Sequence, residues 1–261
     1  TFLSIFIQNF IVMPVLVEVC LESVQSAVIA EKAGAHRIEL CSALDLGGIT
    51  PSQGLIRSVC EAVSIPVFVL IRPRQGDFIY NSTELSLMNR DIELAIEAGA
   101  KGIVSGVLDA TGCVDSKATQ QLIRASGGLP FTFHRAFDRT NNPMSALSAI
   151  IELGADRILT SGQASNVKAG SELIRSLIDK AANQITIMPG GGLTPENVGC
   201  ILQTGATEIH LSARAPVPGS TSQIVNSVRF NQSIAGENLH YETSETTLKQ
   251  LFEQINKIQH S

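Results

Sequence analysis

The sequence predicts an α/β protein that forms one domain, a (β/α)8 TIM barrel. Two observations lead to this fold class. Four segments that begin with Gly-Ala resemble one another and follow amphipathic helical stretches, and four further apolar runs lie between them. Strands that alternate with helices form parallel sheets, and eight such units in about 200 residues favour a closed barrel. An open doubly wound sheet is the alternative, but no GxGxxG motif follows the first apolar run.

The eight expected strands come in two alternating sets. The first set consists of apolar runs, at Val15 to Val19, Pro66 to Ile71, Pro130 to His134 and Gln184 to Met188. The second set consists of the Gly-Ala segments, at residues 34–41, 99–106, 154–161 and 205–212. In each Gly-Ala segment the glycine is expected to end the preceding helix, and the residues after it form the next strand.

The helices and the ends of the chain follow from the same pattern. A capping residue before proline predicts helix starts at Thr50-Pro51, Asn142-Pro143 and Thr194-Pro195. We divide the chain into an N-terminal extension of residues 1–14, a barrel of residues 15–232 and a C-terminal segment of residues 233–261. Helical periodicity from Ser244 to Ile258 predicts that the last segment is a helix packed outside the barrel, or a tail.

The composition argues against several classes of function. The chain has 261 residues, of which 44% are hydrophobic and 16% are charged, and its formal net charge is -5. It has no run of Lys and Arg with interleaved aromatics, so a nucleic-acid surface is not expected. No segment is long and apolar enough to predict a membrane span. Five cysteines without a CxxC pair favour a reducing compartment, so a cytoplasmic location is expected.

Side chains along a strand point alternately to its two faces, and this alternation gives the direction of each side chain in the Gly-Ala segments. The fourth residue after each glycine is expected to face the outer helices, and it is always isoleucine: Ile38, Ile103, Ile158 and Ile209. The fifth and seventh residues then point into the barrel. They include Glu39 and Cys41, and the first strand repeats this spacing with Glu18 and Cys20. We therefore expect two carboxylates and two thiols together at the C-terminal mouth, where barrels bind ligands.

The same reasoning places further polar residues at the mouth. Arg72 follows the third strand, His134 ends the fifth and His210 lies in the eighth. Because an isolated buried carboxylate is costly to ionise, we expect Arg72 and His134 to be the partners of Glu18 and Glu39.

An anion site is expected at two neighbouring turns of the mouth. Gly190, Gly191 and Gly192 follow the seventh strand and lead into a predicted helix, and Arg214 follows the eighth strand. Many barrels bind a phosphate at these two places, through backbone N–H groups and a helix N-terminus.

Together these motifs resemble the CutC family, which is named for copper homeostasis. They are Val-Glu-Val-Cys at 17–20, His-Arg-Ile-Glu-Leu-Cys at 36–41, Gly-Gly-Ile-Thr-Pro at 47–51, Ile-Arg-Pro-Arg at 71–74, Thr-Phe-His-Arg-Ala-Phe-Asp at 132–138, Leu-Thr-Ser-Gly at 159–162 and Met-Pro-Gly-Gly-Gly at 188–192. The resemblance extends from Val15 to Phe230 and implies a cytosolic TIM barrel that forms a homo-oligomer, either a dimer or a tetramer. It also implies that Cys20 and Cys41 are Cu(I) ligands and that the protein acts in copper handling.

The chemistry of copper agrees with this implication in part. Cu(I) is soft and prefers thiolate sulfur, and thiols on adjacent parallel strands about 4.8 Å apart could share one ion if the strand ends are level. Against this, burial and neighbouring carboxylates raise the pKa of a thiol, and buried free cysteine is common as a small hydrophobic residue. We expect a structural role for Cys60, Cys113 and Cys200.

An enzyme is the alternative hypothesis. The expected mouth residues could perform acid/base catalysis on a small anionic metabolite that carries a phosphate or a carboxylate. They are Glu18, Glu39, Arg72, Asp109, His134 and His210. No lysine lies at a strand end, which disfavours Schiff-base chemistry. A third hypothesis, a barrel that binds without chemistry, is disfavoured by the polar mouth.

Overall fold

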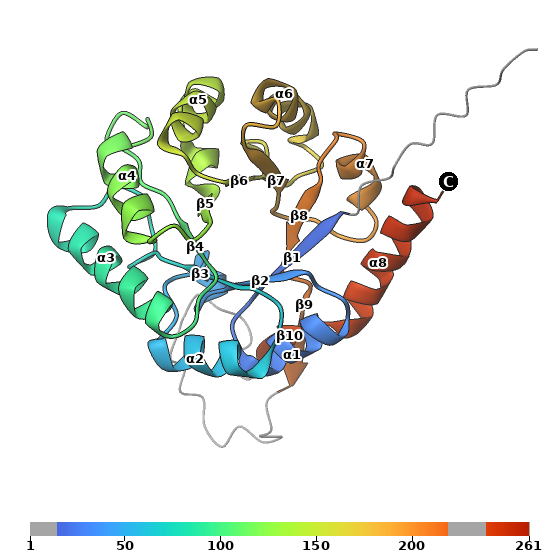
Figure 1. Cartoon of the computed structure of the whole chain (residues 1–261). Helices are drawn as coiled ribbons and strands as arrows, with labels where there is room; N and C mark the ends of the chain where they lie inside the picture. Colours follow the sequence, from blue (N-terminus) through green and yellow to red (C-terminus); the bar gives the residue numbers. More distant parts are fainter. Residues whose placement is uncertain (1–14, 219–238, 261) are drawn as a thin grey trace, which may run out of the picture.

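Eight parallel strands form a ring in chain order, which confirms the predicted TIM barrel (Figure 1). The computed structural model describes residues 15–218 and 239–260. The barrel strands are β1 (Leu16–Leu21), β2 (Arg37–Leu40), β3 (Val67–Leu70), β4 (Gly102–Ser105), β5 (Phe131–Phe133), β6 (Arg157–Thr160), β7 (Thr186–Pro189) and β8 (Glu208–Leu211). Strand β1 pairs with both β2 and β8, and a bridge between Gly190 and His210 joins β7 to β8.

Helices surround the ring of strands on the outside (Figure 1). They are α1 (Val24–Lys32), α2 (Gln53–Ala62), α3 (Ser82–Glu97), α4 (Ser116–Ala125), α5 (Pro143–Leu153), α6 (Ser171–Ala181), α7 (Val198–Leu202) and α8 (Glu245–Gln259). Two short 3-10 helices, η1 (Leu44–Leu46) and η2 (Arg135–Arg139), follow β2 and β5. Among the described residues, no helix combines the length and the apolar character needed to cross a membrane.

The alternation of the strands separates two layers of side chains. The main hydrophobic core lies between the strands and the helices, and it completely buries the four repeated isoleucines: Ile38, Ile103, Ile158 and Ile209. A smaller cluster lies inside the barrel and consists of Cys20, Cys41, Phe68, Leu70 and Val104. The predicted inward and outward faces of the strands are therefore confirmed.

Short-range signals define many of the helix ends, though not all those expected. Asn142 caps α5 and Pro143 is its first residue, as predicted. The expected starts at Thr50 and Thr194 were wrong. The Thr50 hydroxyl instead accepts a hydrogen bond from the backbone of Arg72, and the cap of α2 is Ser52. Thr194 lies in a turn before α7, which has only five residues.

Glycines permit the turns between helices and the following strands. The four glycines of the repeated segments all adopt positive φ angles: Gly34, Gly99, Gly154 and Gly205. This backbone conformation is the one that glycine adopts most easily at a helix C-terminus.

The C-terminal helix packs on the outside of the barrel. Helix α8 contacts α1 and α7 and buries Leu248, Leu251 and Ile255 (Figure 1). It follows an antiparallel pair of strands, β9 (Arg214–Pro218) and β10 (Leu239–Thr243). The N-terminal extension of residues 1–14 and the boundary expected between residues 232 and 233 lie outside the described residues.

The close fit of the barrel interior is tested at Gly102 on β4. A Cβ atom on this residue would lie 2.5 Å from the Phe68 ring, so Gly102→Ala is expected to lower the free energy of unfolding by about 1–3 kcal/mol. The matched control is Gly54→Ala in the exposed first turn of α2, where the nearest atom to a Cβ is Ser52 Oγ at 4.0 Å and helix propensity improves. The stability of both variants is measured by chemical denaturation. An equal change in the two variants would contradict this interpretation.

Candidate functional site

Strands β1 and β2 bring Glu39 and two thiols together at the mouth, as the sequence predicts, whereas Glu18, which was expected there as well, lies deeper in the barrel. The Sγ atoms of Cys20 and Cys41 lie 3.6 Å apart, and the Cys20 thiol donates a hydrogen bond of 3.6 Å to Glu39 Oε1. Both thiols are free, and they are 3% and 0% exposed, respectively. Their sulfur atoms are close enough to contact one soft metal ion together.

The two cysteines do not occupy level positions on their strands. Cys20 pairs in register with Glu39, whereas Cys41 follows the last residue of β2. Cys20 lines the mouth cavity, and Cys41 packs behind it with its sulfur 3.7 Å from the carbonyl oxygen of Leu21. The thiols therefore meet through a staggered arrangement of parallel strands rather than across level strand ends.

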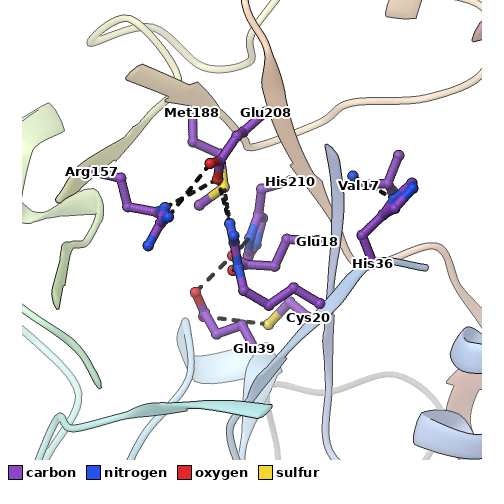
Figure 2. Close-up of polar contacts among 10 residues, drawn as sticks. Val17, Glu18, Cys20, His36, Glu39, Arg157, Met188, Glu208 and His210 are labelled. Carbon is purple, nitrogen blue, oxygen red and sulfur yellow. Dashed lines mark hydrogen bonds and ion pairs between the residues drawn. The ribbon is translucent and has the colours of Figure 1, made fainter. Parts of the chain in front are cut away.

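A network of buried and partly buried ion pairs lies deeper in the barrel than the thiols. Arg37 Nε donates to Glu18 Oε2, and Arg37 Nη2 donates to Glu208 Oε2 at 2.6 Å. Arg157 Nε reaches the same Glu208 oxygen at 3.0 Å (Figure 2). His210 Nδ1 lies 2.8 Å from the second oxygen of Glu18. We call Glu18, Arg37, Arg157 and Glu208 the floor network. It connects β1, β2, β6 and β8.

The partners predicted for the two carboxylates were wrong. Glu18 pairs with Arg37 and His210, and Glu39 lies against Cys20 and 3.9 Å from His210 Nδ1. A signal for the actual partners is present in the sequence. The third residue after each repeated glycine has the same inward phase as the fifth, and this position holds Arg37, Gly102, Arg157 and Glu208.

Arg72 and His134 have other contacts near the mouth. The Arg72 guanidinium donates to the carbonyl oxygens of Leu46, Gly48 and Gly76, so it holds two loops together. His134 Nδ1 accepts a hydrogen bond from a backbone N–H of η2. Burial and the charge of Arg72 lower the pKa of His134 to about 3, so its ring is neutral at physiological pH.

The surroundings shift the pKa values of the two glutamates in opposite directions. Burial raises the pKa of Glu18, but the hydrogen bond from His210 and the charge of Arg37 outweigh it and hold this pKa at about 2. Burial dominates at Glu39 and raises its pKa to about 7. The pKa of Cys20 is also raised, by its hydrogen bond with Cys41 and by burial. At neutral pH the Cys20 thiol is therefore protonated and Glu18 is ionised.

A cavity of about 350 Å³ opens at the C-terminal mouth, where the sequence predicts a ligand site. Its lining includes Cys20, Glu39, Arg72, His134, His210 and the Gly191-Gly192 turn. Glu18 is completely buried in the floor network and does not line the cavity. Asp109 also lies away from it and accepts hydrogen bonds from Thr111 and Cys113 within its own loop.

Two arginines near the mouth differ in how free their charge is to bind a ligand. Arg214 forms ion pairs with Glu22 and Asp45 and stacks on Tyr241, so its charge is already compensated. Arg135 was not predicted from the sequence. It lines the cavity because η2 follows β5 directly, a turn whose geometry strand periodicity does not reveal.

Three of the mouth residues could also ligate a metal ion together. Ligand atoms of Cys20, Glu39 and His210 all lie within 4.8 Å of one another (Figure 2). His210 interacts with Glu18 through Nδ1, which leaves Nε2 for a metal. A carboxylate that orients a ligating histidine in this way is a common arrangement at metal sites.

Comparison with known proteins shows that this chain is similar to proteins named for copper homeostasis. A family model described as the CutC family matches residues 15–215. The chain is 46% identical to the copper homeostasis protein cutC homolog of Mus musculus over 233 residues, which cover 89% of this chain and 86% of the relative. It is 50% identical to the Homo sapiens homolog over 201 residues, 77% of this chain and 74% of that protein. A solved CutC structure from Streptococcus agalactiae aligns with a TM-score of 0.73 and 37% identity over 76% of this chain and 98% of that one.

The low pKa of Glu18 predicts a specific loss of stability in acid. An unfolded glutamate takes up its proton near pH 4.5, whereas folded Glu18 takes it up only near pH 2. Stability from this group is therefore complete above pH 4.5 and decreases as the pH falls toward 2, by roughly 3 kcal/mol. Urea unfolding of Glu18→Gln should show a shallower decrease over this range and, at pH 7, a loss of about 3–5 kcal/mol. Replacing the exposed Glu61 by Gln is the control. If the stability of Glu18→Gln fell in acid as steeply as that of the wild type, the loss could not be assigned to Glu18.

Proposed function

Because the chain belongs to the CutC family, we propose that it binds Cu(I) at the barrel mouth and acts in copper homeostasis. The observation that carries this proposal is the pair of free, buried thiols with sulfur atoms 3.6 Å apart. Two sulfur donors satisfy the low coordination number that Cu(I) accepts. A cytoplasmic location and a dimeric or tetrameric assembly stay predictions.

The exposure of the thiols suggests the order in which they meet the ion. Cys20 lines the cavity and Cys41 lies behind it, so an incoming ion would contact Cys20 first and then draw in the second sulfur. The apolar cluster around both sulfurs, which includes Leu70 and Val104, would shield one side of a bound ion from water. Exclusion of water favours soft sulfur donors over oxygen donors.

The carboxylates beside the thiols have a chemical role in this proposal. A thiol must lose its proton to bind metal, and the Cys20 thiol already donates its hydrogen bond to Glu39. With a pKa of about 7, Glu39 can receive that proton when the ion arrives and release it afterwards. A carboxylate beside a thiol raises the pKa of the thiol and so disfavours metal binding. In this proposal the same carboxylate, Glu39, serves as the proton acceptor.

The thiols are tested by a competitive Cu(I) titration under reducing conditions. The variant Cys20→Ser/Cys41→Ser is expected to lose more than about 100-fold in affinity, since loss of groups around a metal site alone reaches roughly 10–100-fold. Cys60→Ser/Cys113→Ser is the matched control, because these thiols lie outside the mouth, and it should bind as the wild type does. Glu39→Gln keeps both sulfurs and should retain one-to-one binding. Unchanged affinity in the double mouth variant would refute the proposal.

The proton released by Cys20 predicts a pH dependence of binding. Its pKa is raised, so the thiol carries its proton across pH 6–8 in the free protein and loses it in the complex. The apparent Cu(I) affinity should then rise by about tenfold per pH unit for each proton released. The same titration repeated between pH 6 and 8 measures this slope, and a flat profile would contradict coordination by the Cys20 thiolate.

A further inference from the structure

Unpaired hydrogen-bond donors belong to residues that line the mouth cavity after β3, β5 and β7, and we propose that they bind the oxyanion group of a small phosphorylated or carboxylated metabolite. The thiols belong to β1 and β2, whereas the donors follow β3, β5 and β7, and β5 lies across the ring from β1 (Figure 1). This site is separate from the copper ligands and does not rest on the proposed copper function.

The first group of donors is the backbone after β7. No described residue accepts a hydrogen bond from the N–H groups of Gly191, Gly192 or Leu193, and all three residues line the cavity. The φ angles of the two glycines are +109° and +70°, so a side chain at either position would be strained. Consecutive N–H groups without internal partners are a common feature of anion-binding turns.

Arg135 lies directly against this turn. A Cβ atom on Gly191 would be 3.0 Å from the Arg135 guanidinium carbon, so the guanidinium packs on the glycine backbone. Its Nε donates to Asp138 and its Nη2 donates to Ser161, each at 2.8 Å. Nη1 has no hydrogen-bond partner within the described ranges. These two contacts fix the guanidinium beside the turn and leave one of its N–H edges available to a ligand.

Two side chains that line the cavity also keep unpaired donors. Arg72 Nε and His134 Nε2 are buried and have no hydrogen-bond partner in the described part of the chain. His134 is neutral and its Nδ1 accepts a hydrogen bond, so its proton is on Nε2, which is therefore a donor as well. Buried donors without acceptors are costly, and a ligand that supplies acceptor atoms would remove this cost.

The chemistry of the donors defines the class of ligand. Backbone N–H groups, two guanidinium groups and an imidazole N–H offer hydrogens and, in the arginines, positive charge. They match a phosphate or a carboxylate, which supplies acceptors and negative charge. The cavity of about 350 Å³ fits a small metabolite, whose remaining hydroxyl groups would face Glu39 and Cys20. The turn after β7 is also a frequent phosphate site in barrels.

The proposal is tested by calorimetric titration with inorganic phosphate, glycerol 3-phosphate and lactate. Wild-type protein is expected to bind at least one organic anion more tightly than inorganic phosphate. Tighter binding of glycerol 3-phosphate would identify phosphate as the recognised group, and tighter binding of lactate would identify carboxylate. Arg135→Gln should weaken this binding by at least about tenfold, as expected for loss of a charged donor. Arg90→Gln is the matched control, because Arg90 also pairs with an acid three residues later but lies on α3, away from the mouth.

Further measurements separate a local effect from misfolding. Cu(I) affinity of Arg135→Gln should equal that of the wild type, because this residue contacts neither thiol, and its thermal unfolding should stay cooperative although its contacts with Asp138 and Ser161 are lost. His134→Asn keeps an oxygen that can accept the η2 backbone N–H but lacks Nε2, so it should weaken organic-anion binding by about two- to tenfold. The proposal is overturned if the wild type binds none of the three anions at millimolar concentration. Equal effects of Arg135→Gln and Arg90→Gln would overturn it as well.

Discussion

The floor network of buried charges is the constraint on which the rest of the barrel depends. Two glutamates and two arginines from β1, β2, β6 and β8 balance one another inside the ring. A buried charge that loses its partner costs several kcal/mol, so each strand must keep its position along the barrel. A shift of β2 by one residue would turn Arg37 toward the apolar outer core and leave Glu18 unpaired. The network therefore selects one register among those that hydrophobic packing alone would permit.

The same network sets the chemistry of the mouth. Glu18 is held ionised by Arg37 and in turn orients His210, which lies beside Glu39. Glu39 has no arginine partner, so burial raises its pKa and it can accept the thiol proton of Cys20. A continuous series of contacts thus joins the floor to the thiols. Two inward glutamates of neighbouring strands acquire different proton affinities because only Glu18, the deeper one, forms an ion pair with an arginine.

The mouth combines two chemically different groups of residues above this floor. Strands β1 and β2 provide sulfur and carboxylate groups, which suit a soft cation. The loops after β3, β5 and β7 provide N–H donors and guanidinium groups, which suit an oxyanion. Parallel strands make this division possible, because every strand ends at the same side of the barrel and each following loop varies independently. The copper binding and the anion binding that we propose should therefore be separable by substitution although they share one cavity.

The repeated Gly-Ala segments were enough to predict the barrel, the outward isoleucines and the meeting of Cys20, Glu39 and Cys41. These features depend on the period of a strand and on the order of elements, both of which are local properties. The same alternation marks Arg37, Arg157 and Glu208 as inward residues. Which of them pairs with Glu18, however, depends on the stagger between strands far apart in the chain. The position of Arg135 against Gly191 likewise depends on how two loops, from β5 and β7, meet across the mouth. Local periodicity thus determined which side chains enter the barrel, and only the closed tertiary structure decided which of them touch, because contacts across a ring join residues that no sequence spacing relates.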